Sequence, residues 1–318
     1  MADWPPRVRR LHLLWLLVPA LGLLELGLHV AFARRAPGIE AWRALAGAAL
    51  ALKRPGEPVV VAPEWAEPLA RLALGDRIFP LAELARADDR SVPRVLEIAE
   101  LGARAPGSRA WPVVSETREG PFVLRVLQNP SPLHVTYRFV DHVRPGDLSV
   151  TLVRGGVEKS CEYTDHARAM AGGLHGQVAA PRERFQCPGG ESMFVGITVI
   201  DDQGYRPRRC IWADPPAQGA FRLRFSAVPL GARLHGFAGR SYFLYRDGVG
   251  GKVTLSASSG QTELGSLRLL DAPGRETGWL GFELSTAALT GQTADVELEI
   301  RSDGAFQKNF CFAAEAVD

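Results

Sequence analysis

The chain has 318 residues and a formal net charge of +2, with 46% hydrophobic and 23% charged residues. So little charge excludes a disordered tail, and the absence of a basic excess argues against nucleic-acid binding. The hydrophobic fraction is too low for a polytopic transporter, and the length predicts about two domains or three small ones.

The first predicted element is an apolar block, Leu11–Ala33, which is long enough to cross a bilayer core as a helix. Arginines stand on both sides, within residues 1–10 and at 34–35. We predict an uncleaved, single-pass signal anchor in the inner (cytoplasmic) membrane. The alternative is a cleaved signal peptide ending at Ala31-Phe32-Ala33, although secretory apolar regions usually run only about 7–15 residues. In both cases residues 1–10 stay in the cytoplasm and the bulk of the chain is exported, to the periplasm or cell envelope.

Two ionisable residues interrupt the apolar block. Glu25 and His29 are four residues apart and therefore share one helical face. Ionisable groups inside a membrane are costly and usually face protein, so one hypothesis is a contact with a partner membrane helix. The other is a pair near the outer interface that reaches water.

A small α/β region is expected over residues 34–110. Helical patterns cover Ile39–Lys53 and Glu64–Leu74, and a short apolar strand, Pro58–Ala62, lies between them. A further helix is predicted over Ser91–Leu101, with Ser91 as its cap. The region has neither GxGxxG nor GxxxxGK, so no phosphate-binding loop is predicted.

Part of this region resembles another class of protein. The stretch PGEPVVVAPEWAEPLARLALGD, Pro55–Asp76, is similar to exported soluble parts of bacterial polytopic glycosyltransferases that use lipid-linked sugars. The similarity spans only these residues and includes no catalytic motif. It implies a shared environment and gives no evidence of transferase activity.

From Trp111 onward, alternating apolar and polar residues separated by Gly, Pro and Asp predict β-strands. The pattern repeats at similar spacing, which predicts two tandem β-sandwiches over 111–216 and 217–318, each of normal size for such a domain. The matched pairs are Phe122–Val126 with Phe221–Phe225, Val150–Leu152 with Val253–Leu255, Phe185 with Phe282, and Val199–Ile200 with Glu299–Ile300.

The second unit carries a family resemblance. The sequence GWLGFELSTAALTGQTADVELEIRSDG, Gly278–Gly304, is similar to late strands of galactose-binding-like jelly rolls of the carbohydrate-binding-module type. Leu284-Ser285 departs from the usual Asp-Leu-Ser. The first unit closes on Ile211–Pro215, which resembles the W-x-D-P end of such domains. The resemblance implies a mainly β fold with two jelly-roll-like sandwiches; the positions that fit are Trp279, Thr286, Leu289, Gly291 and Val296–Ile300.

All four cysteines follow the apolar block, and an even number in an exported chain suits disulfides. Cys161 and Cys187 lie in a turn-rich stretch and are predicted to pair. Cys210 and Cys311 lie in closing strands, where either a mutual bond or two buried free thiols would fit. No spacing typical of a zinc site occurs.

Several polar groups are candidate sites of chemistry. Asp141-His142 and Asp165-His166, with His175 nearby, contain acid–base pairs, but adjacent strand residues point to opposite faces, which is poor geometry for a metal or catalytic site. Asp201-Asp202 precedes a Gln-Gly turn and is interpreted as a solvated turn. We therefore predict no catalytic residue, no metal and no cofactor.

Sugar binding usually needs an aromatic ring that stacks on a pyranose, assisted by polar side chains. Aromatic and basic residues that stand in or beside predicted loops are the candidates, with core packing as the competing interpretation. They are Tyr205, Arg240, Tyr242, Tyr245 and Trp279.

These observations favour a membrane-anchored envelope protein that binds glycan, or serves as an accessory subunit, without catalysis. One alternative is an enzyme of cell-envelope polysaccharide metabolism, acting by glycan transfer or hydrolysis. The other is a structural partner of a second membrane protein, in contact through Glu25 and His29.

Overall fold

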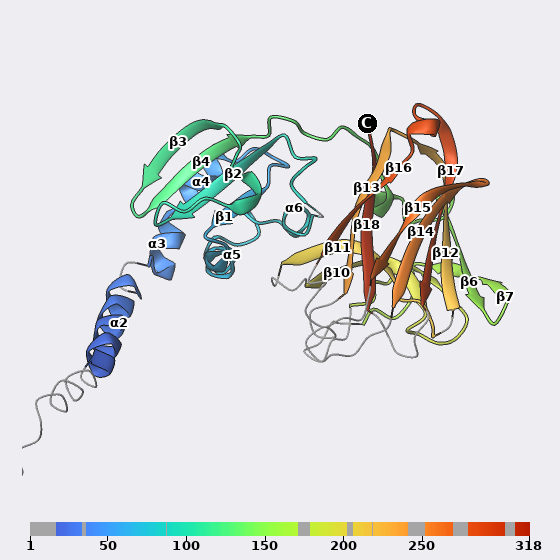
Figure 1. Ribbon diagram of the computed structural model, residues 1–318, viewed down its shortest axis with the longest axis horizontal. Coiled ribbons are helices and arrows are strands. Elements are labelled where there is room, and N and C mark those ends of the chain that lie inside the picture. Colours follow the sequence, from blue (N-terminus) through green and yellow to red (C-terminus); the bar gives the residue numbers. More distant parts are fainter. Residues whose placement is uncertain are drawn as a thin grey trace, which may run out of the picture. The chain divides into compact units, whose positions relative to one another are not determined.

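The computed structural model describes most of the chain and divides it into two compact units (Figure 1). Unit 1 comprises Met1–Pro80 and Arg94–Gln128, and unit 2 comprises Leu81–Pro93 and Asn129–Asp318. We call Leu81–Pro93 the inserted segment, because it interrupts unit 1 in sequence but belongs to unit 2. The described residues are 17–33, 36–86, 88–170, 179–201, 206–217, 219–240, 252–269, 279–302 and 309–318.

Unit 1 contains a four-stranded sheet in the order β1-β2-β4-β3. The first two strands are parallel neighbours, and the other pairs are antiparallel. The bounds are β1 (Val59–Ala62), β2 (Arg94–Glu100), β4 (Phe122–Gln128) and β3 (Val113–Glu119).

Short helices complete unit 1 and account for the predicted helical stretches. They pack through small or aromatic residues: Trp42 is fully buried, and its ring lies 4.4 Å from that of Phe122 between centroids. Ala70 and Leu74, one turn apart, are also buried. The bounds are α3 (Ile39–Ala44), α4 (Ala46–Leu52), the 3₁₀ turn η1 (Glu64–Ala66), α5 (Glu67–Leu74) and the 3₁₀ turn η2 (Pro106–Ser108).

The predicted helix over Ser91–Leu101 is wrong, because these residues form β2. The strand is buried on both faces, so it lacks the alternation of a half-exposed strand and its apolar run also fits a helical pattern. The boundary predicted at residue 110 is displaced as well: β4 pairs with β2, β3 pairs with β4, and both strands extend unit 1 to Gln128.

A buried ion-pair network lies on one face of this sheet. Glu97 of β2 has no exposed surface, and its carboxylate accepts hydrogen bonds from Arg125 Nη1 at 2.9 Å and from the Ala105 amide at 2.8 Å. Arg104 Nε lies 3.2 Å from the same carboxylate. Arg125 also donates to Glu116 on β3 at 2.7 Å. Because each buried charge has partners, the network is compatible with the apolar interior.

Unit 2 is a β-sandwich of an eight-stranded and a six-stranded sheet around one apolar core, in which Phe221, Phe225, Phe310 and Phe312 are fully buried (Figure 1). The eight-stranded sheet runs β16 (Leu280–Ser285), β13 (Arg233–Arg240), β18 (Phe310–Val317), β11 (Pro207–Ala213), β10 (Phe194–Asp201), β9 (Arg184–Gln186), β8 (Glu162–Thr164), with β5 (Val135–Arg138) pairing with β18. The six-stranded sheet runs β15 (Thr262–Leu269), β14 (Val253–Ser259), β17 (Thr293–Ser302), β12 (Gly219–Pro229), β6 (Leu148–Arg154), β7 (Val157–Ser160). Short helices of unit 2 are α6 (Leu81–Leu84), η3 (Phe139–His142) and η4 (Ala287–Leu289).

The predicted mainly β fold is confirmed, but its arrangement as two tandem sandwiches needs correction. Strands from both expected units share the same two sheets: β12 lies between β6 and β17, and β11 pairs with β18. The strands of the two expected units therefore form one continuous sandwich. Phe122–Val126 and Phe221–Phe225 belong to strands of different units. The two sequences match because the apolar residues of both strands are buried.

Both cysteine pairs form disulfides within the sandwich. Cys161 is bonded to Cys187, as predicted from their spacing. Cys210 on β11 is bonded to Cys311 on β18, with Cα atoms 5.7 Å apart. The second bond joins neighbouring strands of a single sheet, which resolves the two alternatives left by the sequence in favour of the mutual bond.

The described part of the N-terminal apolar block is the helix α2 (Leu17–Ala33). Residues 11–16 of the predicted span lie outside the described residues. Among the residues that are described, no helix is both long and apolar enough to cross a membrane.

Candidate functional site

The register of the eight-stranded sheet places one polar residue from each of four strands in a row. His235 on β13 lies opposite Glu283 on β16 and opposite Glu315 on β18, and Glu315 lies opposite Arg138 on β5. Their sequence neighbours, including Leu234, belong to the sandwich core. Because side chains alternate between the two faces of a strand, the row lies on the outer face of the sheet.

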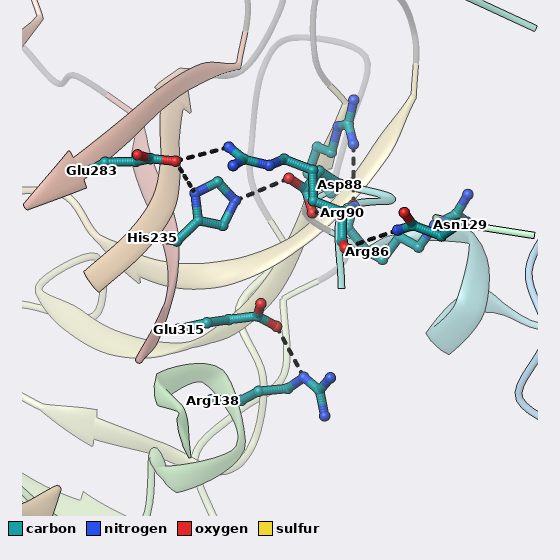
Figure 2. Close-up of polar contacts among 9 residues, drawn as sticks. Arg86, Asp88, Arg90, Asn129, Arg138, His235, Glu283 and Glu315 are labelled. Atoms are coloured by element: carbon teal, nitrogen blue, oxygen red, sulfur yellow. Dashed lines mark hydrogen bonds and ion pairs between the residues drawn. The ribbon is translucent and has the colours of Figure 1, made fainter. Parts of the chain in front are cut away.

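The inserted segment supplies two more charged groups to this row (Figure 2). His235 Nε2 lies 2.9 Å from Asp88 Oδ2, and Arg90 Nη1 donates to Glu283 Oε1 at 2.9 Å. The other ring nitrogen of His235, Nδ1, lies 3.6 Å from Glu283 and has no hydrogen bond to any described residue. At the far end of the row, Arg138 donates to Glu315 at 2.9 Å.

The electrostatics of the row differ from one carboxyl group to the next. The hydrogen bond from Arg90 lowers the pKa of Glu283. Burial raises the pKa of Glu315, and the nearby guanidinium of Arg138 opposes that effect. His235, which lies between Asp88 and Glu283, is only 3% exposed. The row therefore holds the inserted segment against the sheet and gives little access to a ligand.

Backbone contacts hold the same segment in place. Arg208 Nη1 on β11 donates to the carbonyl oxygen of Arg86 at 3.1 Å. The side-chain amide of Asn129 donates to the carbonyl oxygens of Arg90 and Val92 at 3.1 and 3.0 Å. Sequence reasoning missed this site because Asp88 and Arg90 lie 147 and 193 positions from their partners His235 and Glu283. The sequence signal for this site is a polar residue, such as His235, within an otherwise apolar strand.

A second part of the outer face is aromatic. Trp212 on β11 is 5% exposed and stacks on Phe194, with ring centroids 6.1 Å apart. These residues cluster with the Cys210–Cys311 disulfide, and Trp279 packs against the cluster while staying partly exposed. The indole Nε1 groups of Trp212 and Trp279 are both buried and have no hydrogen-bond partner in the described part of the chain.

The predicted glycan-binding residues do not all converge. Trp279 precedes β16 and belongs to the outer aromatic cluster. Arg240 ends β13 opposite Phe310, whose side chain lies in the sandwich core. Paired residues of neighbouring strands share a face, so Arg240 lies on the core side of the sheet, whereas Trp279 lies on the outer side. Tyr205, Tyr242 and Tyr245 lie outside the described residues.

The Asp-His dipeptides occupy separate environments. Asp141 pairs with Arg209, and His142 lies 2.9 Å from Asp147, so the first dipeptide does not act as a unit. Asp165 and His166 contact each other at 3.1 Å on the surface.

The remaining predicted polar positions add no metal site. Asp201 ends β10, whereas Asp202 and His175 lie outside the described residues. Within the described ranges, no group of three or more His, Cys, Asp or Glu residues could hold a metal ion.

No known protein family and no curated protein matches the sequence. Among solved structures, the similar chains include β-sandwich carbohydrate-binding modules, the class that the sequence resembles. One comes from work on the promiscuous specificity of such modules: TM-score 0.30, 8% identity, 62% of this chain and 66% of that chain covered.

Two further modules are similar over smaller parts of this chain. One is the C-terminal module of the laminarinase LamC from Zobellia galactanivorans: TM-score 0.23, 14% identity, 37% of this chain and 86% of that one covered. Another was solved in complex with β-1,4-galactotriose: TM-score 0.22, 14% identity, 38% of this chain and 79% of that chain covered. At these TM-scores and identities, no ligand or function is carried over to this chain.

Proposed function

We propose that the chain is a membrane-anchored, extracytoplasmic envelope protein whose β-sandwich binds glycan without catalysing a reaction. The observation that carries the anchoring is the apolar surface of α2, whose large side chains are between 38 and 70% exposed on all sides of the helix. A helix that is hydrophobic all round needs an apolar environment, which a bilayer supplies. The exposed residues are Leu17, Val18, Leu21, Leu23, Leu24, Leu26, Leu28 and Val30.

Two features support an exported location for the rest of the chain. Disulfides form and persist in oxidising compartments, and all four cysteines follow the apolar helix and are bonded. Arginines within residues 1–10 favour a cytoplasmic N-terminus. The proposal is therefore a single-pass protein of the inner membrane, with the sheet of unit 1 and all of unit 2 outside the cytoplasm.

Trp279 supports a glycan ligand. It lies on the outer face of the sandwich, partly exposed and fixed against a disulfide-linked cluster. A rigid, partly exposed aromatic ring offers an apolar face that can pack on a sugar ring.

The test is retention of the detergent-solubilised full chain on a series of immobilised envelope and plant polysaccharides. We expect retention by at least one polysaccharide, and its loss in Trp279→Ala. Trp65→Ala removes an exposed tryptophan of unit 1 and is the matched control that should keep retention. Failure of the unaltered chain to bind any polysaccharide overturns the glycan proposal.

A second candidate role is contact with a partner membrane helix. Glu25 and His29 are both exposed on α2, and neither forms a hydrogen bond or ion pair with the described residues. In a bilayer such groups are stabilised by a protein partner. Co-purification of a stoichiometric membrane protein, lost when Glu25 and His29 are replaced by Leu, would support this role. If nothing co-purifies after mild crosslinking in native membranes, this role is wrong.

A further inference from the structure

Helix α5 of unit 1 has an apolar face that no other described residue of that unit buries. Trp65, in the 3₁₀ turn before the helix, is 65% exposed, and Leu72 is 73% exposed. Pro68, between them, is exposed as well. We call these three residues the α5 stripe.

The α5 stripe points away from the interior of unit 1. The residues of this element that pack inward are Ala66, Ala70 and Leu74. At about 100° per residue, positions 68 and 72 lie on the opposite side of the helix, and position 65 lies close to them. A solvent-facing side of a surface helix is normally polar, so an apolar residue at all three positions is unusual.

Charged residues flank the α5 stripe without interrupting it. Glu67 and Arg71 lie 3.6 Å apart along one edge of the helix. Asp76 and Arg77 follow the helix and are exposed. An apolar strip with tryptophan at one end and charges along its border is the composition of a helix that lies in a membrane interface.

The chain keeps the rest of unit 1, from α3 onward, close to the end of α2. That helix ends at Ala33 and α3 begins at Ile39. Six Cα–Cα steps span at most about 20 Å even when fully extended. If α2 is embedded in a bilayer, unit 1 therefore begins within reach of the headgroup region.

We propose that the α5 stripe rests in the headgroup region of the membrane that carries α2, so that unit 1 contacts the lipid surface directly. This inference rests on the proposed membrane anchoring. The occupant of the exposed helix face is lipid, and Trp65 and Leu72 are the residues that enter it.

The experiment places a polarity-sensitive dye on single introduced cysteines of the full chain. The described structure has no free cysteine, so labelling is confined to the introduced site. The variants are Leu72→Cys on the stripe, Val157→Cys at an exposed position in unit 2 as the control, and Leu24→Cys on α2 as the report of anchoring. Each is reconstituted into phosphatidylcholine vesicles with or without brominated acyl chains, which quench nearby dyes.

We expect brominated lipid to quench the dye at positions 24 and 72 several-fold more than at position 157. Quenching at 24 without quenching at 72 overturns the inference and leaves the anchor intact. No quenching at 24 overturns the anchoring itself. A dye at 72 that reports an apolar environment only at high protein-to-lipid ratio, without quenching, identifies a second copy as the occupant and overturns the inference.

A second measurement avoids the dye, which could itself favour insertion. In the unlabelled full chain, Trp65→Phe should lower the fraction of tryptophan emission that brominated lipid quenches. Trp279→Phe, in unit 2, should leave that fraction unchanged or higher. Equal effects of the two substitutions contradict membrane contact by the α5 stripe.

Discussion

The two units stabilise buried charge in different ways. In unit 1, Glu97 lies inside the sheet, and two arginines and one backbone amide compensate its charge. In unit 2, the row around His235 lies outside the sandwich core and is covered by the inserted segment, while two disulfides cross-link the same unit. Unit 1 therefore depends on electrostatic pairing, and unit 2 depends on covalent links and on one docked segment.

The largest effect should come from the disulfide that joins β11 and β18. Replacing Cys210 and Cys311 with Ala removes a link over 101 positions, and the chain-entropy model predicts a loss of about 5 kcal/mol. The same change at Cys161 and Cys187 opens a link over 26 positions and should cost about 3.5 kcal/mol. Denaturant unfolding of unit 2 measures both. Equal losses would show that loop length does not determine how much each disulfide stabilises this sandwich.

The next effect belongs to unit 1. Arg125→Ala leaves Glu97 buried with less compensation and should destabilise unit 1 by about 3 kcal/mol, because breaking a buried pair strands a charge. Arg118→Ala, on the exposed strand β3, is the control and should change little. Hydrogen exchange of the β2 and β4 amides is the measurement. If both substitutions have the same effect, the Glu97 network does not stabilise unit 1.

In unit 2, Asp88→Ala should loosen the inserted segment by about 1–2 kcal/mol, since it leaves a buried imidazole nitrogen without its partner. Asp88→Asn keeps an acceptor and should retain most of the stability. Faster hydrogen exchange over Leu81–Pro93 in Asp88→Ala alone is the expected result. Protection that is unchanged in both variants would assign the docking to the backbone contacts instead.

The smallest effect concerns pH and has the opposite sign to a normal salt bridge. Glu100 is 1% exposed, and burial raises its pKa above 4.5. The folded state therefore resists ionisation, and unit 1 loses stability as the pH rises from 4.5 toward the folded-state pKa.

Glu100→Gln should consequently stabilise unit 1 at neutral pH and have no effect well below pH 4.5. Glu119→Gln, on the exposed strand β3, is the control. Thermal unfolding at several pH values compares the two variants. A stabilisation by Glu100→Gln that does not depend on pH would contradict the burial of an ionisable group as its cause.

The sequence predicts local features well where local rules decide them. The helices near Trp42 and Ala70, the strand that includes Val61 and the Cys161–Cys187 bond all follow from spacing and turn residues. The residues of β2 give the pattern of a helix instead, because burial on both faces removes the alternation that separates the two structures.

Long-range features could not be predicted in the same way. A repeated strand pattern indicates that two segments are each half-buried, but it does not predict which sheet each segment joins. Strand partners such as Phe221 with Leu152 and with Ile300 are chosen by packing across the whole core. The contact between Asp88 and His235 likewise depends on where the inserted segment docks, and neither residue signals the other in sequence.

Segments of the two units alternate along the chain, which limits the fragments that could fold on their own. A fragment that begins at residue 129 carries every strand of the sandwich but lacks Asp88 and Arg90, which leaves His235 and Glu283 uncovered. A fragment that ends at residue 80 carries β1 but none of the strands with which it forms a sheet. Cutting the chain at a single point therefore damages at least one of the two units.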